Sequence, residues 1–311
     1  MPARNLIAIG AGLTSALLFA AITTGHPLAM LVVPFSMLPL FLIGLSSGVT
    51  TTIISLVVAT IVVASICGFI GGIIYVAAEA VPAFAISKHL KSFNNKGNNQ
   101  YSRAPASKLI SYITGYASIL LILIFVSSLG LEGGFIGMVE RQLNMALEPL
   151  ISNNLNSEES IKNLASQIAR LAPGTMTAWW LAITLISLGI SQALLKRFSN
   201  IYVFNLNLAY AKNPYWIVFG LAISLVIGLI SDGLAGIIGW NLFQVLIVPF
   251  IFVGLMVIHL LCKGWAPGPL FIGVFYLIMF VRGWPMFLVA ILGFFEQWVK
   301  LRDRLGAANS T

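Results

Sequence analysis

One carboxylate, Glu79, lies inside an otherwise apolar stretch of the chain, within the segment 77–82. An ionisable group in a membrane-spanning segment is costly, so it marks a candidate functional site. Pro82 lacks a backbone N–H and therefore frees the carbonyl of Ala78, beside this carboxylate. A kinked helix with a carboxylate at the kink suits the binding of a small solute or a cation. The alternative is a carboxyl group that bonds a neighbouring helix or reaches toward the membrane interface.

A second group of polar residues lies where one apolar stretch ends and the next begins. Asp232 ends the first of these stretches, and Asn241 and Gln244, one helical turn apart, begin the second. The three side chains could line one small-solute site. A charge at a helix end costs little, however, so Asp232 is also explained as an interfacial helix end. The predicted ligand-binding residues are therefore Glu79, Asp232, Asn241 and Gln244.

Small residues recur at every fourth position near the N-terminus and form one smooth stripe down a helix: Ala8, Gly12, Ala16 and Ala20. Small side chains let another helix backbone approach closely, and in lipid such packing drives helix association. We predict that this stripe is a helix-docking face. It docks either a partner subunit or a neighbouring helix of the same bundle.

Signatures of catalysis, metal binding and cofactor binding are weak. Residues 44–48 formally match G-x-S-x-G, but that motif needs a strand-to-helix turn and here closes an apolar stretch. An intramembrane serine protease would need a histidine beside Ser46, and His259 is the only histidine predicted inside a span. The sequence has no H-E-x-x-H, no P-loop and no Cys/His cluster, and Cys67 and Cys262 lack metal-ligand spacing. We expect no enzyme activity, no metal and no cofactor.

The elements that must position these residues are membrane helices. Apolar residues make up 59% of the 311 residues and charged residues only 8%, whereas soluble domains carry roughly 25% charged residues. The apolar runs are about 20 residues long, enough to span a bilayer, and backbone pairing in lipid requires them to be helical. The predicted fold is an all-α, polytopic transmembrane helix bundle of about ten spans, with eight or nine as alternatives. The predicted spans are 6–24, 28–47, 49–67, 70–88, 108–129, 174–195, 215–234, 240–261, 267–281 and 284–299.

The net charge of +8 does not indicate a nucleic-acid partner, because the basic residues are scattered at span ends rather than gathered into a patch. Their positions indicate topology instead, since lysine and arginine are enriched in cytoplasmic loops. With ten spans, the basic segments fall on the side of Arg4: the connector 89–107, the turn after the sixth span and the C-terminal end. We therefore expect both termini to be cytoplasmic.

The sequence predicts one integral membrane domain over residues 1–311, with an extracytoplasmic insert at 130–173. Within the insert, two stretches repeat apolar residues at helical spacing, and Asn156 with Glu159 resembles a capping box at the start of the second. We predict an amphipathic helical hairpin that lies on the outer membrane surface or caps the bundle. The cytoplasmic connector, rich in asparagine and serine, is predicted to be flexible.

Several segments of the C-terminal half carry a family resemblance: 239–242, 249–250, 254–259, and the ending 292–298 with the cluster 301–305. They resemble the YybS-like family of uncharacterised bacterial multi-pass membrane proteins. That family is thought to be distantly similar to the S components of energy-coupling-factor transporters, which bind vitamins or metals. The resemblance implies a protein of the bacterial cytoplasmic (inner) membrane, with a stripe similar to the face by which S components dock a coupling subunit. S components have fewer spans than this chain, so no ligand residues are carried over.

Three functional hypotheses remain. The first is a transport-related component that binds a small-molecule solute between helices, surrounded by membrane lipid and partnered by a coupling or other membrane subunit. The second is a membrane assembly or scaffold protein without a ligand. The third is an intramembrane enzyme centred on Ser46 or Glu79, which the weak catalytic signatures disfavour.

Overall fold

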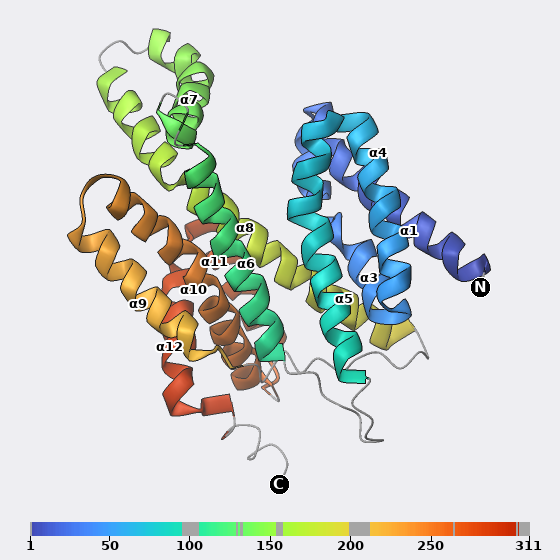
Figure 1. Cartoon of the computed structure of the whole chain (residues 1–311). Coiled ribbons are helices and arrows are strands. Elements are labelled where there is room, and N and C mark those ends of the chain that lie inside the picture. Colours follow the sequence, from blue (N-terminus) through green and yellow to red (C-terminus); the bar gives the residue numbers. More distant parts are fainter. Residues whose placement is uncertain are drawn as a thin grey trace. The chain divides into compact units, whose positions relative to one another are not determined.

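The structure is a computed structural model that describes residues 2–94, 106–128, 130, 133–153, 158–198, 212–263, 265–302 and 304. Within these residues every regular element is a helix, which confirms the predicted all-α class (Figure 1). The α-helices are α1 (Pro2–Ala20), α2 (Pro27–Val32), α3 (Met37–Ser47), α4 (Val49–Tyr75), α5 (Val81–Asn94), α6 (Ala106–Ser127), α7 (Gly134–Asn153), α8 (Glu158–Phe198), α9 (Tyr215–Ile230), α10 (Gly233–Cys262), α11 (Gly268–Arg282) and α12 (Pro285–Val299). Two 3₁₀-helices, η1 (Ala21–Thr24) and η2 (Val33–Phe35), and a π-helix, η3 (Val76–Ala80), join them.

Several of these helices are long and apolar enough to cross a membrane. Within the described residues there are six such helices, and α11 with α12, bent by 117° at the break between them, makes a seventh if the pair is one span. The count is lower than the predicted ten because α9, α11 and α12 are each shorter than a full span and one long stretch joins two predicted spans. The figure of about ten spans stays a prediction.

The stretch that joins two predicted spans is folded back on itself at Gly68. The backbone there has φ 77° and ψ 175°, a conformation open to glycine alone among common residues. Beyond the turn, Gly72 lies so close to Ala64 that an added Cβ would approach the alanine Cβ to 2.9 Å. Thr52 and Ser87 share a hydrogen bond of 3.1 Å between their hydroxyl oxygens. The 41-residue stretch Val49–His89 therefore forms two antiparallel arms of about 20 residues each, and the predicted boundary near 68–69 is confirmed.

Contacts within the chain define two compact units. Unit 1 holds residues 1–109 and 182–208, and unit 2 holds residues 110–181 and 209–311. The helix α8 contributes residues to both units, because the division falls after Leu181. The prediction of a single integral membrane domain over 1–311 stays a prediction.

In unit 1, α1 packs on the first arm of α4 through the predicted stripe of small residues. Ala8, Gly12, Ala16 and Ala20 are all buried. The Ser55 hydroxyl of α4 donates a hydrogen bond of 2.8 Å to the Ala8 carbonyl, so the two backbones lie close together. The neighbouring-helix alternative therefore accounts for the stripe. The exposed face of α1 is apolar, as a lipid-facing surface requires.

Gly12 is expected to be intolerant of even one methyl group. A Cβ at this position would overlap the carbonyl group of Ser55, which belongs to a helix backbone and cannot rotate away. We expect Gly12→Ala to lower the free energy of unfolding by about 2 kcal/mol, the usual cost of overpacking. The measurement is unfolding of the full chain in mixed micelles by titration with sodium dodecyl sulfate. Gly10→Ala is the matched control, because nothing lies within 4 Å of a Cβ there, and equal effects of the two changes would contradict the prediction.

In unit 2, α10 packs against α9 and α12 around an apolar core. The core cluster is Ile217, Val218, Leu221, Leu246, Phe250 and Ala290. Two glycines let the α10 and α12 backbones touch: a Cβ on Gly254 would overlap the Val289 carbonyl, and one on Gly293 would overlap the Phe250 carbonyl. This close crossing is the packing mode that small residues favour in lipid.

The predicted outer insert is only partly reproduced. Its first amphipathic stretch is the helix α7, as expected. Its second stretch is not a separate helix, because α8 runs without interruption from Glu158 through Pro173 to Phe198. The sequence predicted an insert that ends at 173 and a span that begins at 174, but α8 continues through Pro173 because Asn241 of α10 bonds its backbone there. Asn156, predicted to cap the second helix, and residues 95–105 of the connector lie outside the described residues.

Candidate functional site

Glu79 lies in the π-helix η3, between the second arm of α4 and α5. The π pattern is shown by the Val81 N–H, which bonds the carbonyl of Val76. Pro82 follows directly and has no N–H to offer to the preceding turn, so the helix widens there instead of kinking. Ala78, whose carbonyl was predicted to be freed, keeps an interaction partner. Single π turns inside α-helices are frequent at functional sites.

The Glu79 carboxyl group is buried, with 6% of the residue exposed. The Ser36 hydroxyl, at the start of α3, donates a hydrogen bond of 2.7 Å to Oε1. Oε2 is also buried and has no hydrogen-bond partner among the described residues. One oxygen thus follows the predicted alternative of bonding a neighbouring helix. The other oxygen lacks such a bond among the described residues.

A second buried polar pair lies one turn before Glu79 on the same arm. Tyr75 is fully buried, and its hydroxyl oxygen lies 2.7 Å from that of Ser15 in α1. The ring of Phe19 packs edge-on against the Tyr75 ring at 5.1 Å between centroids. Because side chains four residues apart lie on one side of a helix, Tyr75 and Glu79 face the same interior.

Hydroxyl side chains are abundant in the interior of unit 1, where small residues such as serine and threonine let membrane helices pack closely. Its buried hydroxyl residues include Ser15, Ser36, Thr51, Thr52, Ser55, Ser87, Thr184, Ser187 and Ser191. Several of them bond helix carbonyls of their own turn or of a neighbour, which satisfies them without a ligand. They nevertheless place polar oxygens both above and below Glu79 along the bundle.

Glu79 makes no ion pair within the described residues. The cation nearest in sequence on its own helix is Lys88, nine residues on, which corresponds to about 13 Å along the helix axis. In α1, Arg4 donates from Nε to the Thr51 hydroxyl at 3.0 Å and from Nη2 to the Ser47 carbonyl. Arg4 thus bonds the end of α3 and the start of α4, and the Glu79 carboxyl group has no protein counter-charge among the described residues.

The second predicted group is not assembled into one site. Asp232 is exposed at the start of α10 and makes no capping bond, whereas Asn241 is fully buried. Nine residues separate them, about 13 Å along the helix. Gln244 accepts a hydrogen bond of 2.7 Å from the Thr175 hydroxyl, at an exposed position. The binding of a ligand by these residues stays a prediction.

Asn241 completes the backbone of another helix. Its Oδ1 accepts from the Gly174 N–H, and its Nδ2 donates to the Arg170 carbonyl at 2.9 Å and to the Ile237 carbonyl at 2.7 Å. Gly174 and Arg170 are the pair that an undisturbed α-helix would bond to each other. Pro173 disturbs α8 at this turn, and the amide of Asn241 inserts between the two groups. Gly174 is required here, because a Cβ would come within 2.6 Å of the Asn241 Cα.

A family match covers most of the chain. Residues 13–296 match the family described as "Predicted membrane protein (DUF2232)". The chain belongs to this family. It is thus an uncharacterised multi-pass membrane protein of the DUF2232 family, and both Glu79 and Asn241 lie inside the matched range. The match does not address the similarity to S components, which stays a prediction. No curated protein and no solved structure gives a significant match.

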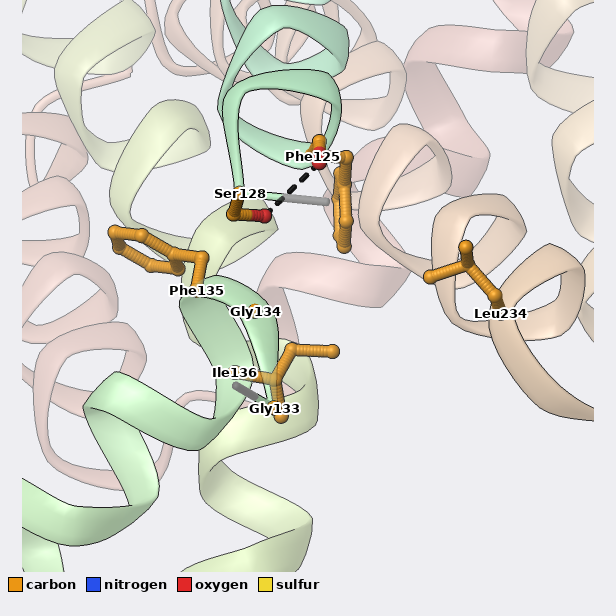
Figure 2. A pocket seen from close by; sticks show the side chains of 7 residues that line it. All are labelled: Phe125, Ser128, Gly133, Gly134, Phe135, Ile136 and Leu234. Carbon is orange, nitrogen blue, oxygen red and sulfur yellow. Dashed lines mark hydrogen bonds between the residues drawn. The ribbon is translucent and has the colours of Figure 1, made fainter. Parts of the chain in front are cut away.

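A pocket in unit 2 of this DUF2232 protein is mainly apolar. It has a volume of about 200 Å³ and is lined by Phe125, Ser128, Gly133, Gly134, Phe135, Ile136 and Leu234 (Figure 2). Its one hydroxyl, that of Ser128, is turned toward the Phe125 carbonyl and donates to it at 2.9 Å. The only side-chain hydroxyl of the described lining is thus already hydrogen-bonded to the protein, and the predicted site residues lie elsewhere.

Within the described residues of this DUF2232 chain, Ser46 has no general base among its hydrogen-bond partners. Ser46 lies inside the helix α3 and donates a hydrogen bond of 2.7 Å to the Leu42 carbonyl, with the Ser47 hydroxyl as its other contact. Neither contact is a general base. His259 instead bonds the Leu255 carbonyl through Nδ1 and packs on the Tyr276 ring. Among the described residues, no group of three or more His, Cys, Asp or Glu side chains could hold a metal ion.

Sequence reasoning missed a buried ion pair at the end of α12. Arg302 Nε lies 3.0 Å from Glu296 Oε1, and the two side chains are each only 3% exposed. In the sequence, the aromatic run and basic cluster at this end of the chain counted only as part of the family resemblance. The available signal was the presence of two opposite charges, Glu296 and Arg302, at the end of an apolar helix.

Proposed function

We propose that this protein is a transport-related membrane component that binds a small cationic solute at Glu79 in unit 1. One observation carries the proposal: a carboxyl group buried among helices has one oxygen, Oε2, without a partner among the described residues. A buried carboxylate without a counter-charge costs several kcal/mol. Binding of a positive group at Oε2 would remove that cost, which is why the ligand is cationic.

The scaffold alternative leaves Glu79 unexplained. A protein that only packs helices together gains nothing from a buried carboxyl group whose second oxygen is unsatisfied, because leucine would avoid the cost. Such expensive groups inside membrane helices mark ion and substrate pathways. The π-helix and the hydroxyl-rich surroundings add polar groups in the same place.

The same proposal includes placement and partners. We propose about ten spans, both termini in the cytoplasm and location in the bacterial cytoplasmic (inner) membrane, on the basis of the positive-inside distribution and the family resemblance. We further propose a binding rather than an enzymatic role, since Ser46 contacts no base. A coupling or other membrane subunit would contact a surface other than the Ala8–Ala20 stripe, which α4 already covers.

We expect Glu79→Gln to abolish ligand binding without unfolding the protein. Glutamine keeps an oxygen that accepts from Ser36, so the local hydrogen bond survives. The probes are protons, supplied by lowering the pH, small organic amines and monovalent metal ions, each added to the full chain in lipid nanodiscs. A ligand present at about 100 times its Kd raises the free energy of unfolding by about 2.7 kcal/mol, which shows as a higher thermal midpoint.

Asp232→Asn is the matched control, because it also removes one carboxylate but at an exposed helix end. A probe that stabilises the wild type and Asp232→Asn, but not Glu79→Gln, supports binding at Glu79. Equal stabilisation of all three proteins, or of none by any probe, would sink the binding proposal and leave the scaffold as the better account.

A further inference from the structure

We infer that the cation held at Glu79 is a proton, and that the arrangement shown is the proton-loaded form with Oε2 carrying the hydrogen. The inference deepens the proposed function and rests on it for its role in transport. It is drawn from the charges, the oxygen ligands and the hydrogen-bond partners that surround the carboxyl group.

The charged groups around Glu79 are the first observation that favours a proton. The described elements packed around Glu79 bring no cation to it: α3 and η2 contain no ionisable residue, and α1 contains only Arg4, which bonds Thr51 and Ser47. In α5, Lys88 is exposed, and His89 follows it near the end of the helix. The α8 part of unit 1 carries Lys196 and Arg197 in its last turn. Tyr75 is the titratable neighbour, and its hydroxyl is paired with that of Ser15.

A carboxyl group in these surroundings is held in its neutral form. Water-free burial penalises the anion by several kcal/mol, and such groups bind a proton rather than remain charged. The hydrogen bond from Ser36 to Oε1 fits the neutral acid, because it leaves Oε2 as the oxygen that carries the proton. Oε2 is thus the hydroxyl oxygen of a carboxylic acid, and this hydroxyl has no hydrogen-bond partner among the described residues.

The number of oxygen ligands around Glu79 also favours a proton over a metal ion. Hard metal ions in proteins take about six or more oxygen ligands. Among the described residues, the Glu79 carboxyl group makes a hydrogen bond with Ser36 alone, whose hydroxyl donates its hydrogen to Oε1. Among the described residues, no group of three or more acidic, histidine or cysteine side chains could hold a metal ion here. A proton needs only one oxygen, so it fits where a metal ion lacks ligands.

Polar side chains near Glu79 offer the proton a route along the helical arm. Hydroxyl pairs lie on both sides of Glu79 along its helical arm: Tyr75 with Ser15 in one direction, and Ser87 with Thr52 in the other. Release breaks the O–H bond at Oε2, the proton passes to a water molecule or a solute amine, and the carboxylate remains. Uptake reverses the step, so atoms and charge balance. Because side-chain hydroxyls both donate and accept, these pairs would carry water-assisted transfer toward either end of the arm.

The test is modification by dicyclohexylcarbodiimide, an apolar reagent that reacts with protonated carboxyl groups in membranes. The full chain in proteoliposomes is treated over a series of pH values, and the adduct is located by peptide mass spectrometry. We expect an adduct at Glu79 whose yield falls as the pH rises and does not change with added Na⁺ or K⁺. Glu79→Gln should lose this adduct completely, while Asp232→Asn should keep it.

Infrared difference spectra provide a second measurement that does not depend on reagent access. The wild type minus Glu79→Gln should show a carboxylic acid C=O band at neutral pH, and Glu79→Asp should retain a shifted band. Protection of Glu79 by Na⁺ or K⁺ would overturn the proton as ligand and leave cation binding standing. Absence of both the adduct and the acid band in folded protein would overturn the inference. A protonated Glu79 whose substitution changes no binding would instead sink the proposed function alone.

Discussion

Replacing Asn241 with leucine is expected to lower the free energy of unfolding by about 4 kcal/mol. The change keeps the side-chain size but removes the amide that bonds the Gly174 N–H and the Arg170 carbonyl. Each buried backbone group left without a partner costs roughly 1–3 kcal/mol, and more in lipid. Because both groups belong to α8 next to Pro173, the helix should open at that turn. Titration with sodium dodecyl sulfate, followed by circular dichroism, measures the loss.

The cause can be separated from a general packing defect by a double-mutant cycle with Pro173→Ala. Without the proline ring, α8 can form its own bond between Arg170 and Gly174, and Asn241 is no longer required. We expect Pro173→Ala to restore much of the stability lost in Asn241→Leu. Gln244→Leu is the control on the same face, with an expected loss below about 1 kcal/mol, because its partner Thr175 is exposed and also bonds the Leu171 carbonyl. Strictly additive effects of the first two changes would contradict the bridging role.

The membrane class and the positions of most helices were predictable, because apolar runs and the need to pair every backbone group in lipid leave few alternatives. The turn at Gly68 was also predictable in place, since the span 49–67 reaches full length just before it. The continuity of α8 across 173–174 was not predictable, and the reason is physical. Pro173 disturbs the helix backbone, and the group that bonds the disturbed backbone, Asn241, lies far away in the sequence.

The candidate site was predictable in one part only. Glu79 stood out because a charge inside an apolar run is rare and expensive. Its partner Ser36 carried no signal, because serine is common in membrane helices and only the fold brings it to the carboxyl group. Asn241 was predicted to bind a ligand, which stays a prediction, and a single sequence cannot tell a ligand contact from the backbone contacts that the structure shows. The charge of Asp232 was visible, whereas its exposure was not.

Replacing Glu296 with alanine is expected to lower the free energy of unfolding by about 4 kcal/mol. The carboxylate accepts from the backbone N–H groups of Leu301 and Arg302 at 2.8 and 3.0 Å, and from Arg302 Nε at 3.0 Å. These bonds close the end of α12, where Lys300 adopts the left-handed conformation with φ 55°. Removing the carboxylate deletes all three bonds and takes a buried charge from beside the guanidinium group, which typically costs 3–5 kcal/mol.

Two further variants decide whether the carboxylate or the turn itself stabilises this end. Lys300→Gly should be neutral or stabilising by up to about 1 kcal/mol, because glycine adopts the left-handed conformation freely. Glu296→Gln keeps one accepting oxygen but no charge. Its free energy of unfolding should therefore lie between those of the wild type and Glu296→Ala. The measurement is unfolding of the full chain, with proteolysis after Arg302 and Lys300 as a local probe of the same end. If Glu296→Gln were as damaging as Glu296→Ala, charge rather than hydrogen-bond number would dominate. If both were harmless, the buried pair would contribute nothing to the closure of α12.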